Sequence, residues 1–428
     1  MSALHLFPGL LQAADPNLPP VSGMAFFLFT ILKLLIIFTI YMVGVAMLTL
    51  AERKISAWIQ DRHGPNRVGK GWLQPAADGL KNFMKEETMP AGVNKPLFVL
   101  APILSFIPAL TAWCVIPFGA PVPTRWGRID LVVADLPIGF LFILAITSLG
   151  VYGIVLAGWS SNNKYALLGG LRSSAQMVSY EISMGMSTIP VLLLAGNVSL
   201  NSIINQQVWG GWNVVNLTVA FFIFIVAAFA ETNRLPFDLP EAESELIAGY
   251  HTEYSAMKFS LFFISEYASM VTASALMATL FFGGWDVPFT ARDNIGPYSG
   301  WLSLLSIGIF LGKILFFLFL FMWVRWTLPR FRYDQLMSLG WKVLLPLALV
   351  YIVLIAAVML GLSAAGIDQG WMYSAILGSV NIALIIILFA ILDRGRVISP
   401  AYGRMHPREI ERLRRIDVRR GAAVGTGR

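Results

Sequence analysis

Apolar residues fall in long blocks along this chain, and polar residues gather between them. Nine such blocks can be traced, at 24–50, 96–117, 136–161, 175–195, 212–230, 259–282, 301–324, 343–362 and 371–392. A helix needs about 20 apolar residues to cross roughly 30 Å of hydrocarbon, and in lipid it satisfies its own backbone hydrogen bonds. The alternation typical of barrel strands is absent. The pattern therefore predicts an all-α polytopic membrane protein with about nine transmembrane helices.

Composition agrees with lipid as the main solvent. Hydrophobic residues make up 57% of the chain and charged residues 13%, whereas soluble proteins carry about 25% charged residues. The first apolar block is too long for a cleaved signal peptide, and no basic residue precedes it. We expect a polar leader at 1–23, an eight-helix membrane domain at 24–362, a ninth transmembrane helix within 363–392 and an arginine-rich tail at 393–428.

The positive charges lie on one side of the predicted bundle. The connections on that side hold 26 of the 31 Lys and Arg residues, at 51–95, 162–174, 231–258, 325–342 and 393–428. By the positive-inside rule this side is cytoplasmic. We therefore expect an inner-membrane protein with its N-terminus outside and its C-terminus in the cytoplasm. The net charge of +7 follows from this topology and does not predict nucleic-acid binding.

Residues that could hold a redox centre are few. Cys114 is the only cysteine, which excludes an internal disulfide or a cysteine-held iron–sulfur cluster within the chain. The four histidines are scattered, without the spacing of metal ligands. The sequence therefore predicts no metal site and no bound redox cofactor.

One stretch has the pattern of a helix at the membrane surface. Within 73–86 the apolar residues recur at helical spacing and form one face. About 14 residues cannot span a bilayer, so we expect an interfacial amphipathic helix. A plain surface helix is the favoured interpretation of the pattern, and one wall of an entrance for an amphipathic molecule is the alternative.

Four charged residues interrupt the apolar blocks, namely Lys33, Glu181, Glu266 and Lys313. Each costs at least about 2.5–3.5 kcal/mol at the bilayer centre unless it is paired or hydrated. Lys33 lies near the end of its block and could reach the interface along its own side chain. The other three are candidates for a buried path of ionisable groups.

The connection at 231–253 is unusually acidic. Against Arg234 alone it carries six carboxylates, those of Glu231, Asp238, Glu241, Glu243, Glu245 and Glu253. Three carboxylates within five residues cannot all ionise freely, so they should share protons. A solvated acidic loop is the ordinary alternative. The neighbouring apolar residues, such as Phe237 and Leu246, favour burial and hence a functional role.

Five stretches of the chain have unusual sequences that occur together in this order. Two of them are Glu52-Arg-Lys through Gly64-Pro-Asn66 and Leu73-Gln-Pro through Lys85-Glu86. The others are Gly170-Leu-Arg through Ser179-Tyr-Glu181, Glu231-Thr-Asn-Arg-Leu-Pro-Phe-Asp-Leu-Pro-Glu-Ala-Glu-Ser-Glu245 and Pro329-Arg-Phe-Arg-Tyr-Asp-Gln-Leu336. Together these stretches resemble the H-subunit family of bacterial respiratory complex I, the proton-translocating NADH:quinone oxidoreductase. This family is the counterpart of the first mitochondrially encoded subunit.

The resemblance implies a subunit that takes quinone as substrate, while flavin and iron–sulfur clusters sit only in partner subunits. The implied partners are iron–sulfur and quinone-site peripheral-arm subunits, small membrane subunits, antiporter-like subunits and the lipid membrane. In such a subunit, buried carboxylates couple the quinone chamber to proton translocation. Carried over, the quinone-chamber candidates are Glu52, Arg53, Arg62, Asp78, Phe237, Arg325 and Arg330. The proton-coupling candidates are Glu181, Glu231, Glu241, Glu243, Glu245, Glu253 and Glu266.

Two departures and three alternatives accompany the resemblance. Many relatives end after eight spans, and some have a carboxylate in the third span, where 136–161 of this chain has none. The membrane subunit of a hydrogenase or of a deazaflavin-linked dehydrogenase would share the fold. A stand-alone ion transporter is less well supported, since internal repeats common in transporters are not seen. A purely structural scaffold is disfavoured by the many costly buried charges.

Overall fold

The computed structural model describes residues 23–124, 127–238, 249–288, 299–367 and 370–392. The predicted leader, except for its last residue, and the arginine-rich tail lie outside the described residues. The same holds for Glu241, Glu243 and Glu245.

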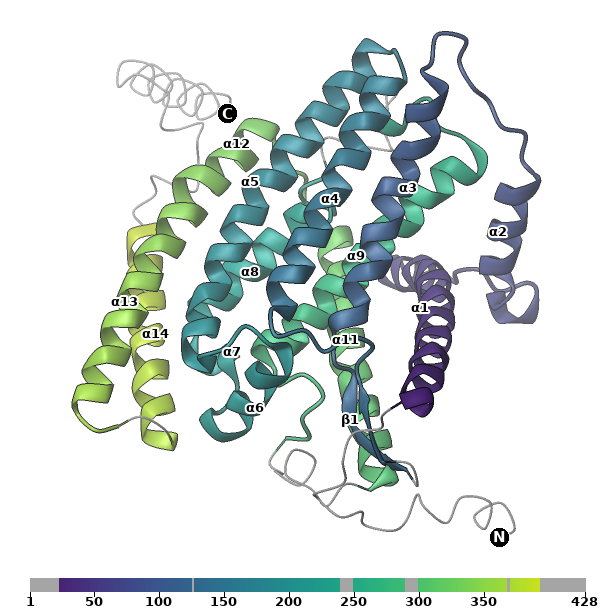
Figure 1. The fold of residues 1–428 in the computed structure, drawn as a ribbon. Coiled ribbons are helices and arrows are strands. Elements are labelled where there is room, and N and C mark those ends of the chain that lie inside the picture. Colours follow the sequence, from purple (N-terminus) through teal and green to yellow (C-terminus); the bar gives the residue numbers. More distant parts are fainter. Residues whose placement is uncertain (1–22, 125–126, 239–248, 289–298, 368–369, 393–428) are drawn as a thin grey trace, which may run out of the picture.

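Eight helical segments are long and apolar enough to cross a membrane within the described part of the chain. They are α1 (Gly23–Ile59), α3 (Lys95–Thr111, continued by η4, Ala112–Val115), α4 (Gly139–Ser160), α5 (Lys164–Ala195), α9 (Ala256–Phe281), α11 (Gly300–Thr327), α12 with α13 (Tyr333–Leu339 and Leu345–Ala364, joined through Gly340–Leu344) and α14 (Trp371–Leu392). Figure 1 shows most of them side by side in one bundle. The prediction of an all-α polytopic membrane protein is confirmed.

The fifth apolar block does not form one long helix. It divides into α7 (Asn213–Asn216) and α8 (Thr218–Glu231), with a break at Leu217, where φ is −136° and ψ is 48°. The side chains of Asn213 and Asn216 donate hydrogen bonds to the carbonyls of Leu280 and Gly210, at 2.9 and 2.8 Å. Such side chains compete with regular helix. The 14-residue α8 is therefore shorter than the span predicted for 212–230.

A β-hairpin was not predicted. Strands β1 (Gly119–Thr124) and β2 (Gly127–Leu131) pair antiparallel between α3 and α4. The Nζ of Lys33 donates to the carbonyls of Asp130 and Val132, at 3.2 and 2.8 Å. Lys33 therefore anchors the hairpin to α1, where the sequence had favoured a side chain reaching for the interface.

Lys313 also donates hydrogen bonds to backbone carbonyls. Its Nζ donates to the carbonyls of Phe282, Gly284 and Asp286, at 2.8, 2.8 and 3.1 Å. These carbonyls follow the end of α9, so the charge on α11 stabilises the C-terminus of a neighbouring helix. The expectation that Lys313 belongs to a buried path of ionisable groups stays a prediction.

Helix α14, which the sequence predicted as a ninth transmembrane segment, contacts α6 (Leu200–Gly210), α7 and α8, and a buried amide is central to this contact. Asn381 is fully buried and donates from Nδ2 to the carbonyl of Asn216 at 2.7 Å. Its Oδ1 accepts from the hydroxyl of Tyr351 on α13 at 2.8 Å and from the backbone of Val219 at 3.3 Å. Helix α14 thus satisfies backbone groups exposed by the break between α7 and α8.

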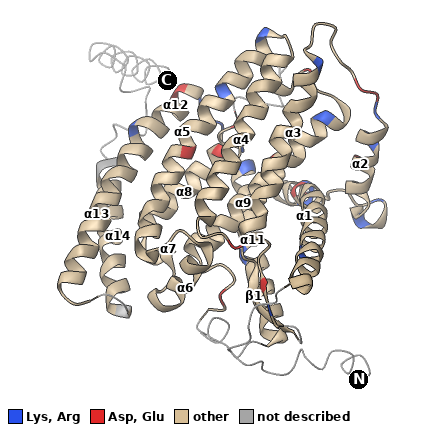
Figure 2. Ribbon diagram, viewed as in Figure 1, with Lys and Arg blue, Asp and Glu red and all other residues tan. Residues whose placement is uncertain are grey.

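The predicted amphipathic helix forms as α2 (Gln74–Met84), which lies at the edge of the bundle in Figure 1 and contacts α1 and α9. Its apolar face points away from the bundle, since Leu80, Phe83 and Met84 are all strongly exposed. Figure 2 shows that many Lys and Arg residues gather at the end of the bundle where α2 lies.

Candidate functional site

A buried carboxylate on α1 gathers three side chains from distant parts of the chain. Glu52 is only 5% exposed. It accepts hydrogen bonds from the hydroxyl of Tyr267 on α9 and from the guanidinium of Arg325 on α11. The Nη1 of Arg234 lies 3.4 Å from Glu52 Oε2. A carboxylate taken out of water needs such partners, because desolvating an unpaired charge costs several kcal/mol.

Arg234 joins this carboxylate to a second one. Its Nε lies 2.7 Å from Glu266 Oε1, and its guanidinium carbon lies 4.2 Å from the centre of the Tyr267 ring. Burial opposes the charge of the guanidinium, but Glu266, Tyr267 and Glu52 outweigh it and raise the pKa of Arg234 above its usual range. One permanently charged arginine therefore bridges two carboxylates. We call Glu52, Arg234, Glu266, Tyr267 and Arg325 the Glu52 network.

The backbone that carries Arg234 is fixed by α5. Helix α8 ends at Glu231, and Asn233 adopts a left-handed conformation with φ of 49°, which asparagine tolerates better than most residues. The Nε2 of Gln176 donates to the carbonyls of Ala230 and Phe237, at 2.9 and 2.8 Å, and to Asn233 Oδ1 at 3.1 Å. This buried amide holds the whole turn in place.

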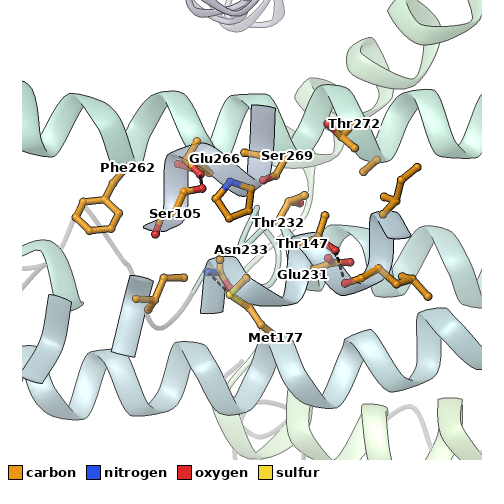
Figure 3. A pocket seen from close by; sticks show the side chains of 18 of the residues that line it. Ser105, Thr147, Met177, Glu231, Thr232, Asn233, Phe262, Glu266, Ser269 and Thr272 are labelled. Atoms are coloured by element: carbon orange, nitrogen blue, oxygen red, sulfur yellow. Dashed lines mark hydrogen bonds between the residues drawn. The ribbon is translucent and has the colours of Figure 1, made fainter. Parts of the chain in front are cut away.

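An internal cavity of about 80 Å³ lies beside the network. Figure 3 shows Glu231 and Glu266 among the side chains that line it, together with hydroxyls of Ser269 and Thr272. Glu266 also lines a smaller hollow of about 10 Å³, which it shares with Arg234, Asp238 and Arg325. Glu266 therefore borders both spaces, with Arg234 bound to it.

Aromatic and cationic side chains lie on the Arg325 side of the network. The ring of Phe237 stacks on that of Phe331, with centroids 5.5 Å apart, and also packs near Tyr180. Arg330 Nη2 lies 3.6 Å from Asp238 Oδ2. Three of the predicted chamber residues, Phe237, Arg325 and Arg330, are thus found on neighbouring segments.

The remaining chamber candidates lie farther out. Arg53 Nη1 pairs with Asp78 Oδ2 at 2.7 Å, which links the end of α1 to α2. Glu52 and Arg53 are adjacent in sequence, but neighbours on a helix point about 100° apart, so one is buried and the other is exposed. Arg62 is exposed and donates to Gln60 Oε1, in its own loop, at 2.8 Å. The structure does not bring Arg62 to the Glu52 network.

The proton-coupling candidates divide in the same way. Glu231 and Glu266 share the internal cavity. Glu181, on α5, is half-buried, and its charge acts on Glu231. Glu253 lies elsewhere, where it accepts from Asn163 Nδ2 at 2.7 Å and lines a surface hollow of about 360 Å³. It is separate from the cavity that holds the other two.

Sequence reasoning missed two members of the network. Arg234 drew attention only as the single cation in an acidic connection, and Tyr267 drew none. A lone arginine among carboxylates, followed by apolar residues, is the signal that could have identified the bridge. The partner helices could not be found this way, because Glu52 and Arg234 are separated by 182 positions.

The buried side chain of His251, near the cavity, should make the folding stability of the chain depend on pH. Burial lowers its pKa to about 4, against about 6.5 in an unfolded chain. Between about pH 6.5 and pH 4, His251 is therefore protonated in the unfolded chain and neutral in the folded chain. Lowering the pH from 7 to 5 should therefore cost about 2 kcal/mol of folding stability through His251. Raising the pH above 7 should change this contribution little. Thermal unfolding of detergent-solubilised His251→Gln should show a correspondingly smaller loss on acidification, whereas exposed His63→Gln should match the parent. Equal losses in all three proteins would contradict this assignment.

Comparison with known proteins decides the family. A sequence model of the NADH dehydrogenase family matches residues 32–356. The H subunit of NADH-quinone oxidoreductase from Leptospira biflexa is 52% identical over 338 residues, covering 76% of this chain and 93% of the relative. A protein of the same description from Cytophaga hutchinsonii is 50% identical over 325 residues, covering 76% of this chain and 94% of the relative. The chain belongs to the H-subunit family of NADH-quinone oxidoreductases.

The H subunit from Frankia alni is 44% identical over 407 residues, covering 95% of this chain and 87% of the relative. This longer match includes most of the chain that follows the 32–356 region, where α14 lies. The resemblance drawn from the five motifs is confirmed by these matches. The names of the relatives agree with an enzyme subunit of a multisubunit NADH-quinone oxidoreductase, and the apolar helices agree with a multi-pass membrane protein.

Proposed function

We propose that this chain forms the quinone entrance and chamber of an NADH-quinone oxidoreductase and couples quinone reduction to proton translocation. The observation that carries the proposal is the bridge made by Arg234. It binds Glu52 on one side and Glu266 on the other, at 3.4 and 2.7 Å. A change of charge at either carboxylate must alter the field at the other, because the arginine cannot release its own proton.

The chamber is proposed on the side of Arg325. A quinone ring needs an apolar or aromatic surface and donors for its two carbonyl oxygens. The stacked rings of Phe237 and Phe331 offer the first, and the guanidinium groups of Arg325 and Arg330 offer the second. Each arginine is paired with a carboxylate, which keeps its charge satisfied before substrate arrives.

The entrance is proposed between α1 and α2. Here the Arg53–Asp78 pair lies beside the exposed apolar face of α2. Such a face can contact the isoprenoid tail of a quinone within the lipid, while the Arg53–Asp78 pair contacts the quinone headgroup. This arrangement supports the entrance-wall alternative for the helix predicted at 73–86.

Coupling is proposed to begin with the protons that quinone takes up. Reduction to quinol requires two electrons, supplied by partner subunits, and two protons. Negative charge developing on the quinone would compete with Glu52 for Arg325. The interaction of Glu52 with Arg234 would change as a result, and with it the ion pair between Arg234 and Glu266. Glu266 faces the internal cavity with Glu231, and the charge of Glu181 acts on Glu231. These carboxylates then form the proposed start of the proton path.

We further propose that the end of the bundle rich in Lys and Arg is cytoplasmic, with the N-terminus outside and the C-terminus inside. The peripheral arm, with its flavin and iron–sulfur clusters, would then dock on the α2 side (Figure 2). Small membrane subunits and antiporter-like subunits are the proposed partners within the membrane.

Affinity purification from the native membrane tests this function. The chain should bring flavin and iron–sulfur subunits with it, and the preparation should reduce quinone with NADH. A chain recovered alone would favour an ion transporter. A hydrogenase module without NADH activity would favour the other alternative.

The entrance predicts a kinetic effect at Asp78. Asp78→Ala should raise the apparent KM for quinone about two- to fivefold, because an ion pair worth about 0.5–1 kcal/mol is lost, while kcat changes less. Stability should stay within about 0.5 kcal/mol of the parent. Steady-state kinetics across quinone concentrations measure this, with exposed Asp61→Ala as the control. A KM equal to that of the control would remove Asp78 from the entrance.

A further inference from the structure

Helix α2, which forms one wall of the proposed entrance, has no buried residue of its own. An element with few buried contacts moves easily, so the position of α2 depends on the polar contacts at its two ends. On one side, Arg53 of α1 pairs with Asp78 at 2.7 Å. The contacts on the other side belong to the linker between α2 and α3, which runs along the edge of the bundle in Figure 1. The proposed reaction does not use them.

The linker is bound to the start of α9 soon after α2 ends at Met84. Glu87 Oε1 lies 2.6 Å from Nζ of Lys258, in the first turn of α9. Thr88 donates from its backbone nitrogen and its hydroxyl to Oγ of Ser255, at 3.0 and 2.8 Å. We call these contacts the latch. The chain from Met84 to Glu87 spans at most about 11 Å, so the latch restricts where the end of α2 can lie.

Lys258 stands on a firm base. Its side chain is only 12% exposed, and its Nζ lies 5.1 Å from the centre of the Phe98 ring, where the face of the ring attracts a cation. Phe98 is fully buried at the start of α3 and stacks on Tyr254, with centroids 4.0 Å apart. A nearly buried ammonium group needs an opposite charge, which Glu87 supplies. The latch therefore ties the weakly packed α2 to a well-packed part of the bundle.

The latch and the Arg53–Asp78 pair lie on either side of the apolar face of α2. Leu80, Phe83 and Met84 are strongly exposed, and they fall between Asp78 and the latch in the sequence. The direction in which this face points therefore depends on both contacts. In the proposed entrance the Arg53–Asp78 pair contacts the quinone headgroup and the apolar face contacts the tail. Loosening the latch should thus affect the tail more than the headgroup.

We propose that the latch holds α2 in the orientation that binds the isoprenoid tail, and so sets the preference of the entrance for long-tailed over short-tailed quinones. Glu87 and Lys258 are positioning residues in this account, because they act on the quinone through α2. The inference rests on the proposed function of α2 as an entrance wall, and it adds the determinant of tail specificity.

Hydrogen–deuterium exchange of α2 in the intact complex tests the latch without reference to quinone. In Lys258→Met, amides of residues 74–84 should exchange about two- to fivefold faster, the range expected for the loss of one ion pair. Glu87→Gln changes only a half-exposed side chain and should have the same effect without endangering the fold. Lys258→Arg, which keeps the charge, and Lys95→Met, at an exposed lysine at the start of α3, should match the parent.

Steady-state kinetics with two quinones test the specificity. For a quinone with a long isoprenoid tail, Lys258→Met and Glu87→Gln should raise the apparent KM about two- to fivefold. For a quinone with a single isoprenoid unit the KM should stay at the parent value, and Lys258→Arg should restore the KM for the long tail. Because the two residues act as one pair, the double variant should be no worse than Lys258→Met.

Two results would overturn the proposal. Unchanged exchange of α2 in Lys258→Met and Glu87→Gln would show that the latch does not hold the helix. Faster exchange with the same KM change for both quinones, or with none, would show that the latch has no part in tail recognition. A parent complex without NADH:quinone activity would instead contradict the proposed function, and with it the tail role, while the exchange of α2 still decides whether the latch holds the helix.

Discussion

Replacing Arg234 with methionine is expected to reduce NADH:quinone reductase activity at least a hundredfold. Methionine keeps much of the length of the side chain and removes the charge. Glu52 and Glu266 would then lose the cation that both contact. Breaking a buried ion pair by removing one partner costs about 3–5 kcal/mol. This free energy is lost from the arrangement of side chains that carries out the reaction, and each 1.36 kcal/mol lost there lowers the rate about tenfold.

Two further variants separate chemistry from folding. Arg234→Lys keeps the charge but cannot fork between two carboxylates, so its activity should lie between those of the parent and Arg234→Met. Arg172→Met removes an exposed arginine on α5 and should behave as the parent. Activity is normalised to assembled complex measured on native gels. Full activity in assembled Arg234→Met would exclude the bridge from function.

Glu231→Gln is expected to lower NADH-driven proton translocation at least tenfold. Glutamine keeps the size and hydrogen-bonding capacity of the side chain but cannot carry a proton between partners. Glu231 lines the cavity that also holds Glu266, together with hydroxyls such as those of Ser269 and Thr272 and with many apolar side chains (Figure 3). Loss of a positioned acid or base typically costs a factor of 10² or more in the step that needs it. Quinone reduction should fall too if the two processes are obligatorily coupled.

Glu253→Gln is the matched control for this prediction. It is also an acidic residue of the same connection, but it lies in a surface hollow where Asn163 binds it. Proton pumping in proteoliposomes, followed with a pH-sensitive dye, should stay close to that of the parent. If Glu253→Gln and Glu231→Gln were equally impaired, the internal cavity would lose its special role.

The apolar pattern predicted most of the fold because lipid imposes one strong rule on every span. It failed where polar side chains bind the backbone. Asn213 and Asn216 interrupt the fifth block, and Lys33 holds a hairpin that has no apolar signature of its own. Boundaries also moved: the helix expected at 175–195 begins at Lys164, since polar positions at a helix end can remain helical outside the hydrocarbon.

The sequence named candidate residues but did not show which of them lie together. Glu52 and Glu266 were assigned to separate roles, whereas both bind Arg234. Arg62 shares a motif with Glu52, and Glu253 shares the acidic connection with Glu231, but both lie apart from these residues. Residues that are adjacent in sequence lie on the same helix or loop. Only the packing of α1, α9 and α11 brings Glu52, Glu266 and Arg325 close to one another. That packing depends on long-range contacts that no local pattern carries.

The central claim is that quinone reduction changes the charge state of Glu266 through Arg234. Infrared difference spectroscopy of the intact complex, triggered by quinone reduction, measures this most directly. The account predicts a carboxyl band that is lost in Glu266→Gln, is strongly reduced in Arg234→Lys and persists in Glu253→Gln. A carboxyl difference spectrum that is unchanged by Glu266→Gln would contradict it.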